Sequence, residues 1–148
     1  MSETASIHAS AVLVGRKAIL IRGPSGAGKS RLAWELVTSS PMRMFARLVA
    51  DDRVYLENHS GRLLARPVTA LAGLIEIHGL GIRRVAFEAV AVVGLIVDLE
   101  ASDGARHPDE PAGTIVIEGI TLPRLPVAAG MAVLPLVVAA LPIPLTGN

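Results

Sequence analysis

The chain has 148 residues, of which 51% are hydrophobic and only 3% aromatic, with 14 basic and 13 acidic side chains and no cysteine. A net charge of +1 excludes an extensive basic surface for nucleic acid, and so few rings leave little for stacking on bases. The lack of cysteine excludes disulfides and thiolate metal sites, and is typical of a protein of the reducing cytoplasm. We expect a single domain over residues 1–148, located in the cytoplasm.

Two segments bear on membranes and secretion. Residues 1–10 lack the basic and apolar regions of a secretory signal. Residues 131–145 are the most apolar stretch, but prolines interrupt them and they are too short for a helix that spans a bilayer. We therefore expect neither secretion nor membrane association.

The first half of the chain predicts strands around one helix. Residues 10–14 and 18–21 are expected to form a hairpin whose second strand leads into a glycine-rich loop. A helix is expected over residues 30–39, and Pro41 with the serines before it is expected to end this helix. Residues 48–50 predict a short buried strand, and residues 53–64 predict two strands joined by a turn.

The second half predicts further strands. Residues 73–77 and 89–99 are apolar, and the longer, β-branched run is expected to be a central strand. Residues 102–113 predict a surface loop, and a hairpin is expected around Glu118. Residues 131–141 are compatible with a buried helix or a strand. The sum is an α/β domain unusually rich in strands.

The glycine-rich loop carries the phosphate-binding pattern G-x-x-x-x-G-K-[ST]. It consists of Gly23, Pro24, Ser25, Gly26, Ala27, Gly28, Lys29 and Ser30. Glycine lets backbone N–H groups approach phosphate oxygens, and the positive end of the following helix dipole faces the anion. In this pattern the lysine contacts the β- and γ-phosphates and the serine hydroxyl binds Mg²⁺, so ATP with Mg²⁺ is the expected ligand.

Asp51 and Asp52 follow the buried run at residues 48–50. The connection from the loop is one helix long, so we expect a neighbouring strand that brings the carboxylates near the γ-phosphate. Adjacent strand residues point to opposite faces, so only one of them should face the reacting centre. That carboxylate would hold Mg²⁺ through water or accept a proton from an attacking hydroxyl. The alternative is a polar strand end with a turn, which the preceding glycine-rich loop makes less favoured.

Glu76 lies within an apolar run, where an unpaired carboxylate is costly to bury. It either faces solvent on an edge strand or pairs with a cation, and we favour a metal ion. The spacing of His8 assigns it no role, and the remaining histidines do not share the spacing of metal ligands. Arg83 and Arg84 are equally compatible with an anion clamp and with a solvated basic turn.

In this order, His8, the loop at residues 23–30, the run at 48–52 and the segment at 75–82 resemble the C-terminal catalytic domain of bacterial HPr kinase/phosphorylase. Residues 76–82 are the most specific part of the likeness, which extends over nearly the whole chain. We expect the separate N-terminal domain of the long members to be absent, as in short forms similar to those of alphaproteobacteria.

The resemblance implies a fold related to phosphoenolpyruvate carboxykinase and an ATP-dependent kinase acting on a serine of HPr, a phosphocarrier of the phosphotransferase system. It also implies a hexamer. By motif position, Lys29 contacts phosphate, Ser30 and Glu76 bind Mg²⁺, and Asp52 accepts the proton from the serine with Asp51 beside it. His8 matches the family's histidine near the reacting phosphate.

The chain departs from the family at two places. Residues 126–131 read Pro-Val-Ala-Ala-Gly-Met, where the family has P-V-R-P-G-R, a motif associated with dephosphorylation. Arginines are suited to the several negative charges of that reverse reaction, so we expect the dephosphorylation to be weak in this chain. The family's catalytic arginine has only Arg106 as a loose counterpart.

Two alternative functions remain, a small-molecule kinase on the same scaffold and a non-catalytic nucleotide-dependent module.

Overall fold

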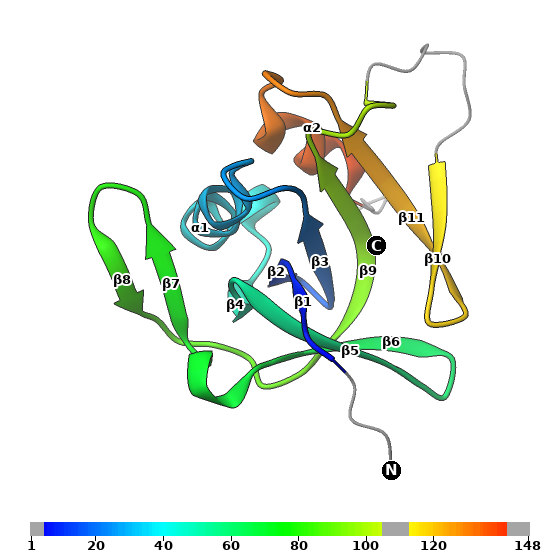
Figure 1. The fold of residues 1–148 in the computed structure, drawn as a ribbon, viewed down its shortest axis with the longest axis horizontal. Helices are drawn as coiled ribbons and strands as arrows, with labels where there is room; N and C mark the ends of the chain where they lie inside the picture. Colours follow the sequence, from blue (N-terminus) through cyan, green and yellow to red (C-terminus); the bar gives the residue numbers. More distant parts are fainter. Residues whose placement is uncertain (1–4, 105–112, 142–148) are drawn as a thin grey trace.

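The computed structural model describes residues 5–104 and 113–141 (Figure 1). The strands are β1 (Ile7–His8), β2 (Ser10–Val14), β3 (Lys17–Arg22), β4 (Ala46–Ala50), β5 (Arg53–His59), β6 (Arg62–Pro67), β7 (Leu74–Ile77), β8 (Gly81–Arg84), β9 (Ala91–Leu99), β10 (Gly113–Ile117) and β11 (Ile120–Val127). The helices are α1 (Lys29–Ser39) and α2 (Val133–Ala140), with short 3₁₀ turns at Pro41–Arg43 and Thr69–Leu71. The expected strand-rich α/β fold is confirmed.

One mixed sheet forms the centre of the described chain, in the order β1-β5-β6-β9-β3-β2-β4, with β11 also on β9 and β10 on β11. β9 runs parallel to β3 and to β11, so the predicted central strand is confirmed. The predicted hairpins β2–β3, β5–β6 and β10–β11 are also present.

The expectation that the strand before Asp51 lies next to the loop-bearing strand is wrong. β4 pairs antiparallel with β2, and β2 separates it from β3. Because both pairings are antiparallel, β3 and β4 point the same way. Their carboxyl ends therefore lie at the same end of the sheet, and Asp51 still lies beside the loop.

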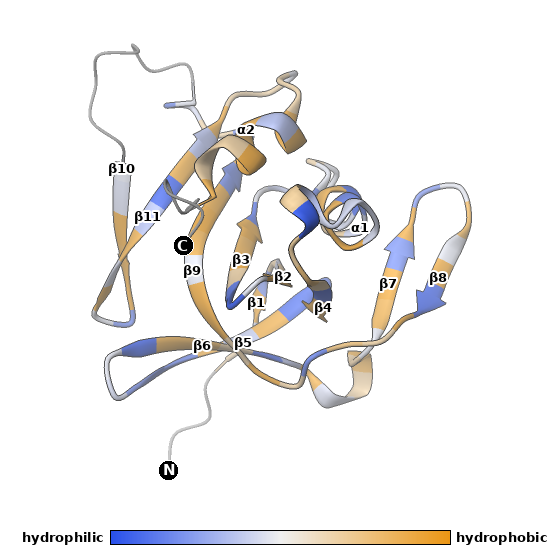
Figure 2. Ribbon diagram, turned by 180° about the vertical axis from the view of Figure 1, so that it is seen from behind, coloured by the Kyte–Doolittle hydropathy of each residue, from blue (hydrophilic) through white to orange (hydrophobic). Residues whose placement is uncertain are grey.

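Aliphatic side chains fill both faces of the sheet, as the scarcity of aromatics requires. Successive residues of β3 point to opposite faces: Ile19 and Ile21 pack beneath α1, whereas Leu20 packs with β5 and β6. Figure 2 shows β3 and β9 as the hydrophobic centre of the molecule. The apolar segment after residue 131 forms a helix, α2, whose Val137 is fully buried against the α1 side of the sheet.

β7 and β8 form a separate two-stranded sheet beside α1, on the side of the molecule away from β10 and β11 (Figure 1). Only Ile75 of this hairpin is fully buried, and all of β8 is exposed. Among the described residues, no helix is long and apolar enough to cross a membrane.

Candidate active site

The glycine-rich loop joins the carboxyl end of β3 to the first turn of α1. Gly28 immediately precedes the helix with φ 102°, a conformation that glycine adopts without the strain of a Cβ. Lys29 Nζ donates hydrogen bonds to the carbonyl oxygens of Gly23 and Pro24, at 2.8 and 3.1 Å. The ammonium group thus closes the loop on itself, and an incoming phosphate would have to replace these two acceptors.

Asp51 is the polar centre of the site. Its side chain is only 4% exposed and accepts hydrogen bonds from the hydroxyls of Ser10 at 2.6 Å and Ser30 at 2.8 Å. The backbone N–H of Glu76 donates to the same carboxylate at 3.2 Å. Four segments of the chain, β2, α1, β4 and β7, therefore converge on one buried carboxylate.

Asp52 points elsewhere, although it is the next residue. Its φ is 71°, and the N–H of Arg53 bonds the carbonyl of Asp51 at 2.8 Å, which makes a tight three-residue turn. The turn breaks the strand and directs the Asp52 side chain to the surface, where it is 70% exposed. As expected, only one of the two aspartates faces the loop, but the cause is this turn rather than alternation along a strand.

His8 lies between Arg53 and Asp52, since β1 pairs with β5 and places His8 opposite Arg53. Arg53 Nη2 is 2.8 Å from His8 Nε2, and His8 Nδ1 is 3.8 Å from Asp52 Oδ1. A guanidinium can only donate, so Nε2 accepts and the neutral ring carries its proton on Nδ1, facing Asp52. Sequence analysis missed Arg53, because its proximity to His8 depends on a strand pairing between distant segments.

Glu76 contributes its backbone to Asp51, but its side chain is exposed and forms no ion pair with the described residues. Its carboxylate thus matches the solvent-facing alternative in the free chain, and a role in metal binding stays a prediction. Arg83 and Arg84 are likewise exposed.

A cluster of ion pairs that sequence analysis missed joins β3, β9 and β11 next to the loop. Arg22, the last residue before the loop, forms a two-pronged pair with Asp98 at 2.7 and 2.8 Å, and Arg124 bonds both Asp98 and Asp103. Burial acts to raise the pKa of Asp98, but the hydrogen bonds and charges of the two arginines outweigh it and hold that pKa below its ordinary value. The hydrogen bonds that Arg124 donates to Asp103 and Asp98 raise the pKa of its guanidinium.

The segment of the missing motif arginines follows this cluster. Pro126 and Val127 end β11, and residues 128–131 form a turn closed by the Met131 N–H on the Ala128 carbonyl. Arg106 lies outside the described residues.

The donors at the loop fit a hard divalent cation. Within residues 5–104 and 113–141, no three histidine or carboxylate side chains are placed to hold a metal by themselves. Mg²⁺ does not need such a set, because it binds through one or two carboxylates together with phosphate oxygens and water. The Ser30 hydroxyl and the Asp51 carboxylate, which lie together at the end of the glycine-rich loop, are oxygen donors of the kind that Mg²⁺ uses.

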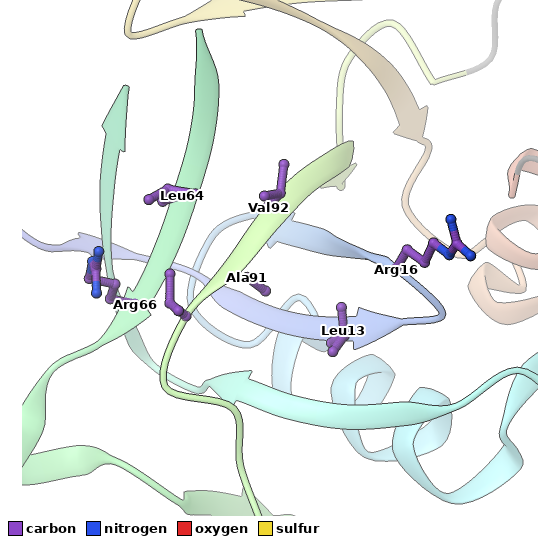
Figure 3. Close-up of a pocket in the computed structure, with 7 residues that line it drawn as sticks. Leu13, Arg16, Leu64, Arg66, Ala91 and Val92 are labelled. Atoms are coloured by element: carbon purple, nitrogen blue, oxygen red, sulfur yellow. The ribbon is translucent and has the colours of Figure 1, made fainter. Parts of the chain in front are cut away.

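An open cavity of about 350 Å³ lies at the other end of the sheet (Figure 3). It is lined by Leu13, Arg16, Leu64, Arg66, Val90, Ala91 and Val92. Leu13 and Arg16 flank the β2–β3 turn, opposite the end of β3 where the loop begins. This cavity is therefore separate from the candidate site.

The chain is similar to several known proteins. The HPr kinase/phosphorylase of Streptococcus thermophilus is 35% identical over 143 residues, 88% of this chain and 45% of that protein. The Mycoplasma mycoides HPr kinase/phosphorylase is 37% identical over 81 residues, 55% of this chain and 24% of that protein. The chain thus spans less than half the length of these curated relatives.

The solved structure of the Hpr(Ser) kinase/phosphatase from Coxiella burnetii shares the fold, with a TM-score of 0.75 at 24% identity over 90% of this chain and 86% of that one. The sequence model of the HPr Serine kinase C-terminal domain matches residues 1–141. This chain therefore belongs to the HPr serine kinase C-terminal domain family.

Proposed function

We propose that the chain is an ATP- and Mg²⁺-dependent kinase that phosphorylates a serine of an HPr-type phosphocarrier protein. The observation that carries the proposal is the different environment of two adjacent carboxylates. Asp51 is buried against Ser30 of the loop, whereas Asp52 is exposed beside His8. We infer that the buried carboxylate helps to bind a cation and that the exposed carboxylate acts on a protein substrate.

In the proposed reaction, residues 23–30 hold the phosphates and Lys29 exchanges its two carbonyl acceptors for phosphate oxygens. Mg²⁺, when bound through Ser30 and Asp51, supplies charge neutralisation at the transferred phosphoryl group. The exposed Asp52 accepts the proton of the attacking serine hydroxyl. The serine oxygen forms the new bond to the γ-phosphorus while the bond to ADP breaks and ADP leaves. His8 Nδ1 lies 3.8 Å from the Asp52 carboxylate, close to the place proposed for the reacting hydroxyl.

We further propose that the reverse reaction, dephosphorylation of the carrier by inorganic phosphate, is weak. Residues 126–131 carry no arginine. Arg22 and Arg124, on the strands beside that segment, are held by Asp98 and Asp103, so we infer that they do not replace the missing cations.

The test mixes the purified chain, Mg·ATP and the host's HPr-type carrier, and follows the carrier by intact mass and fragmentation. We expect one added phosphate on a serine, and a rate lower by about a hundredfold or more for Asp52→Asn, because a positioned general base contributes that much. Glu118→Gln is the matched control: Glu118 is also exposed with positive φ, but it lies at the β10–β11 turn.

Nucleotide binding without transfer to any carrier would refute the kinase proposal and leave a nucleotide-dependent binding module. Transfer of the phosphate to a small molecule instead would support the alternative of a small-molecule kinase on the same scaffold. Incubating the phosphorylated carrier with inorganic phosphate tests the reverse reaction, and efficient dephosphorylation would show that the two missing arginines are dispensable.

A further inference from the structure

Ser10 carries a buried hydroxyl on the strand that lies between the two strands leading to the site. It begins β2, which lies between β3, leading to the loop, and β4, leading to Asp51. Ser10 is fully buried between two buried alanines, Ala9 and Ala11. A hydroxyl in such surroundings is costly unless it makes a hydrogen bond, so its partner identifies its role.

The partner of Ser10 is Asp51, at 2.6 Å, the short distance typical of a hydroxyl that donates to an ionised carboxylate. The same oxygen, Oδ1, also lies 2.8 Å from the Ser30 hydroxyl. Ser10 therefore fixes the rotation of the carboxylate that orients Ser30. Asp51 is too buried for bulk water to replace this donor easily.

Ser10 differs from the other donors in one respect. Ser30 belongs to the phosphate loop, and the Glu76 N–H belongs to the backbone of β7. Ser10 lies outside both, and its hydroxyl bonds Asp51 rather than the loop itself. Groups that hold a metal ligand from behind commonly change metal affinity by about 10- to 100-fold when removed.

We propose that Ser10 is a positioning residue for magnesium, holding Asp51 so that Asp51 and Ser30 present their oxygens to the ion together. The inference rests on the proposed binding of nucleotide with Mg²⁺, but not on the identity of the phosphate acceptor. It predicts that Ser10 controls the magnesium dependence of nucleotide binding rather than nucleotide binding itself.

The experiment measures the affinity of the purified chain for a fluorescent ATP analogue, with excess EDTA and over a series of Mg²⁺ concentrations, without any carrier. For Ser10→Ala we expect the Mg²⁺ concentration at half-maximal enhancement to rise about tenfold, while the affinity in EDTA changes less than about twofold. Ser10→Thr and Ser10→Val form a matched pair, because their side chains have nearly the same shape and only threonine keeps the hydroxyl. Thermal unfolding shows which variants are folded, and either the alanine variant or the pair suffices.

Retention of the magnesium response by Ser10→Thr and its loss in Ser10→Val would support the inference. An equal response in all folded variants would overturn it, as would an equal loss of affinity with and without Mg²⁺, which a purely structural role predicts. A wild-type chain that binds nucleotide without any magnesium response would overturn it together with the magnesium part of the proposed function. A magnesium response governed by Ser10 in a chain that phosphorylates no carrier would overturn the proposed function alone.

Discussion

At the scale of single residues, Asp51 and Asp52 are neighbours in the chain and occupy opposite environments. Asp51 is buried and accepts hydrogen bonds from Ser10, Ser30 and Glu76 N–H, whereas the three-residue turn at Asp52 turns that side chain outward. Every donor around Asp51 needs an acceptor, so the site requires a carboxylate there. Asp52 has no comparable structural role.

We therefore expect Asp51→Asn to lower the free energy of unfolding by about 2 kcal/mol, because the amide replaces an acceptor with a donor that faces other donors. Asp52→Asn should change stability by less than about 0.5 kcal/mol, since its side chain is exposed and asparagine tolerates positive φ. Urea unfolding measures both. Equal destabilisation by the two substitutions would contradict the division of roles.

At the scale of elements, the shape of the glycine-rich loop depends on backbone conformations that favour glycine. Ion pairs join the strands β3, β9 and β11. Gly28 and Gly61 have φ of 102° and 82°, and both have room for an added Cβ. A side chain at either position is therefore opposed by the positive φ alone and not by a steric clash. Gly28 is the last glycine of the glycine-rich loop and precedes α1, and Gly61 lies in the β5–β6 turn.

Gly28→Ala and Gly61→Ala should each cost about 1–2 kcal/mol of stability, the usual cost of a left-handed conformation for a residue with a Cβ. Only Gly28→Ala should also weaken nucleotide binding, because relief of its strain moves the N–H groups that face the phosphates. Titration with ATP in the presence of Mg²⁺ compares the two variants. Unchanged ATP affinity in Gly28→Ala would indicate that nucleotide does not contact this loop.

The Arg22–Asp98–Arg124 cluster predicts a dependence of stability on pH. The folded state holds the pKa of Asp98 below its ordinary value of 3.8, so Asp98 stabilises the fold at neutral pH and loses this contribution as the pH falls through the folded pKa. We expect Asp98→Asn to reduce the free energy of unfolding by about 2 kcal/mol at pH 7, and by less below about pH 4. Urea midpoints at several pH values measure the difference, and a difference that grows on acidification would contradict the assignment.

The sequence predicted the elements at this scale better than the contacts between them. Most strands and α1 were predictable from local alternation, glycine turns and Pro41. The ion-pair cluster was not, because Arg22, Asp98 and Arg124 lie on strands far apart in the chain that meet only through the β3–β9 and β9–β11 pairings. Residues 131–141 stayed ambiguous, since a short, uniformly apolar run has no period that separates helix from strand.

At the scale of the whole molecule, large apolar side chains remain exposed on several elements. Leu80 and Ile82 on the β7–β8 hairpin, Val116 on β10, and Phe45 before β4 are each at least half exposed. Apolar side chains exposed singly in this way are usual on protein surfaces and do not by themselves define an interface. We propose, with the family resemblance, that the chain assembles into a hexamer.

Light scattering after size exclusion should then give a mass six times that of the 15.4 kDa chain, in closed, symmetric particles. Exposed apolar contacts predict that the assembly persists at high salt, which weakens only the charged contributions. A single 15.4 kDa species at micromolar concentration would contradict the proposal.

The sequence by itself determined the phosphate loop, the aspartate pair and the strand-rich α/β class, because each depends on residues that are contiguous or regularly spaced. Only the tertiary structure decided that β2 separates β3 from β4, that Asp51 rather than Asp52 bonds Ser30, and that Arg53 lies against His8. These facts depend on strand order, register and one turn with positive φ, which bring together residues up to 45 positions apart. Ser10 is the clearest example: an ordinary serine in the sequence becomes, once β2 is placed between β3 and β4, the donor behind the buried carboxylate of the site.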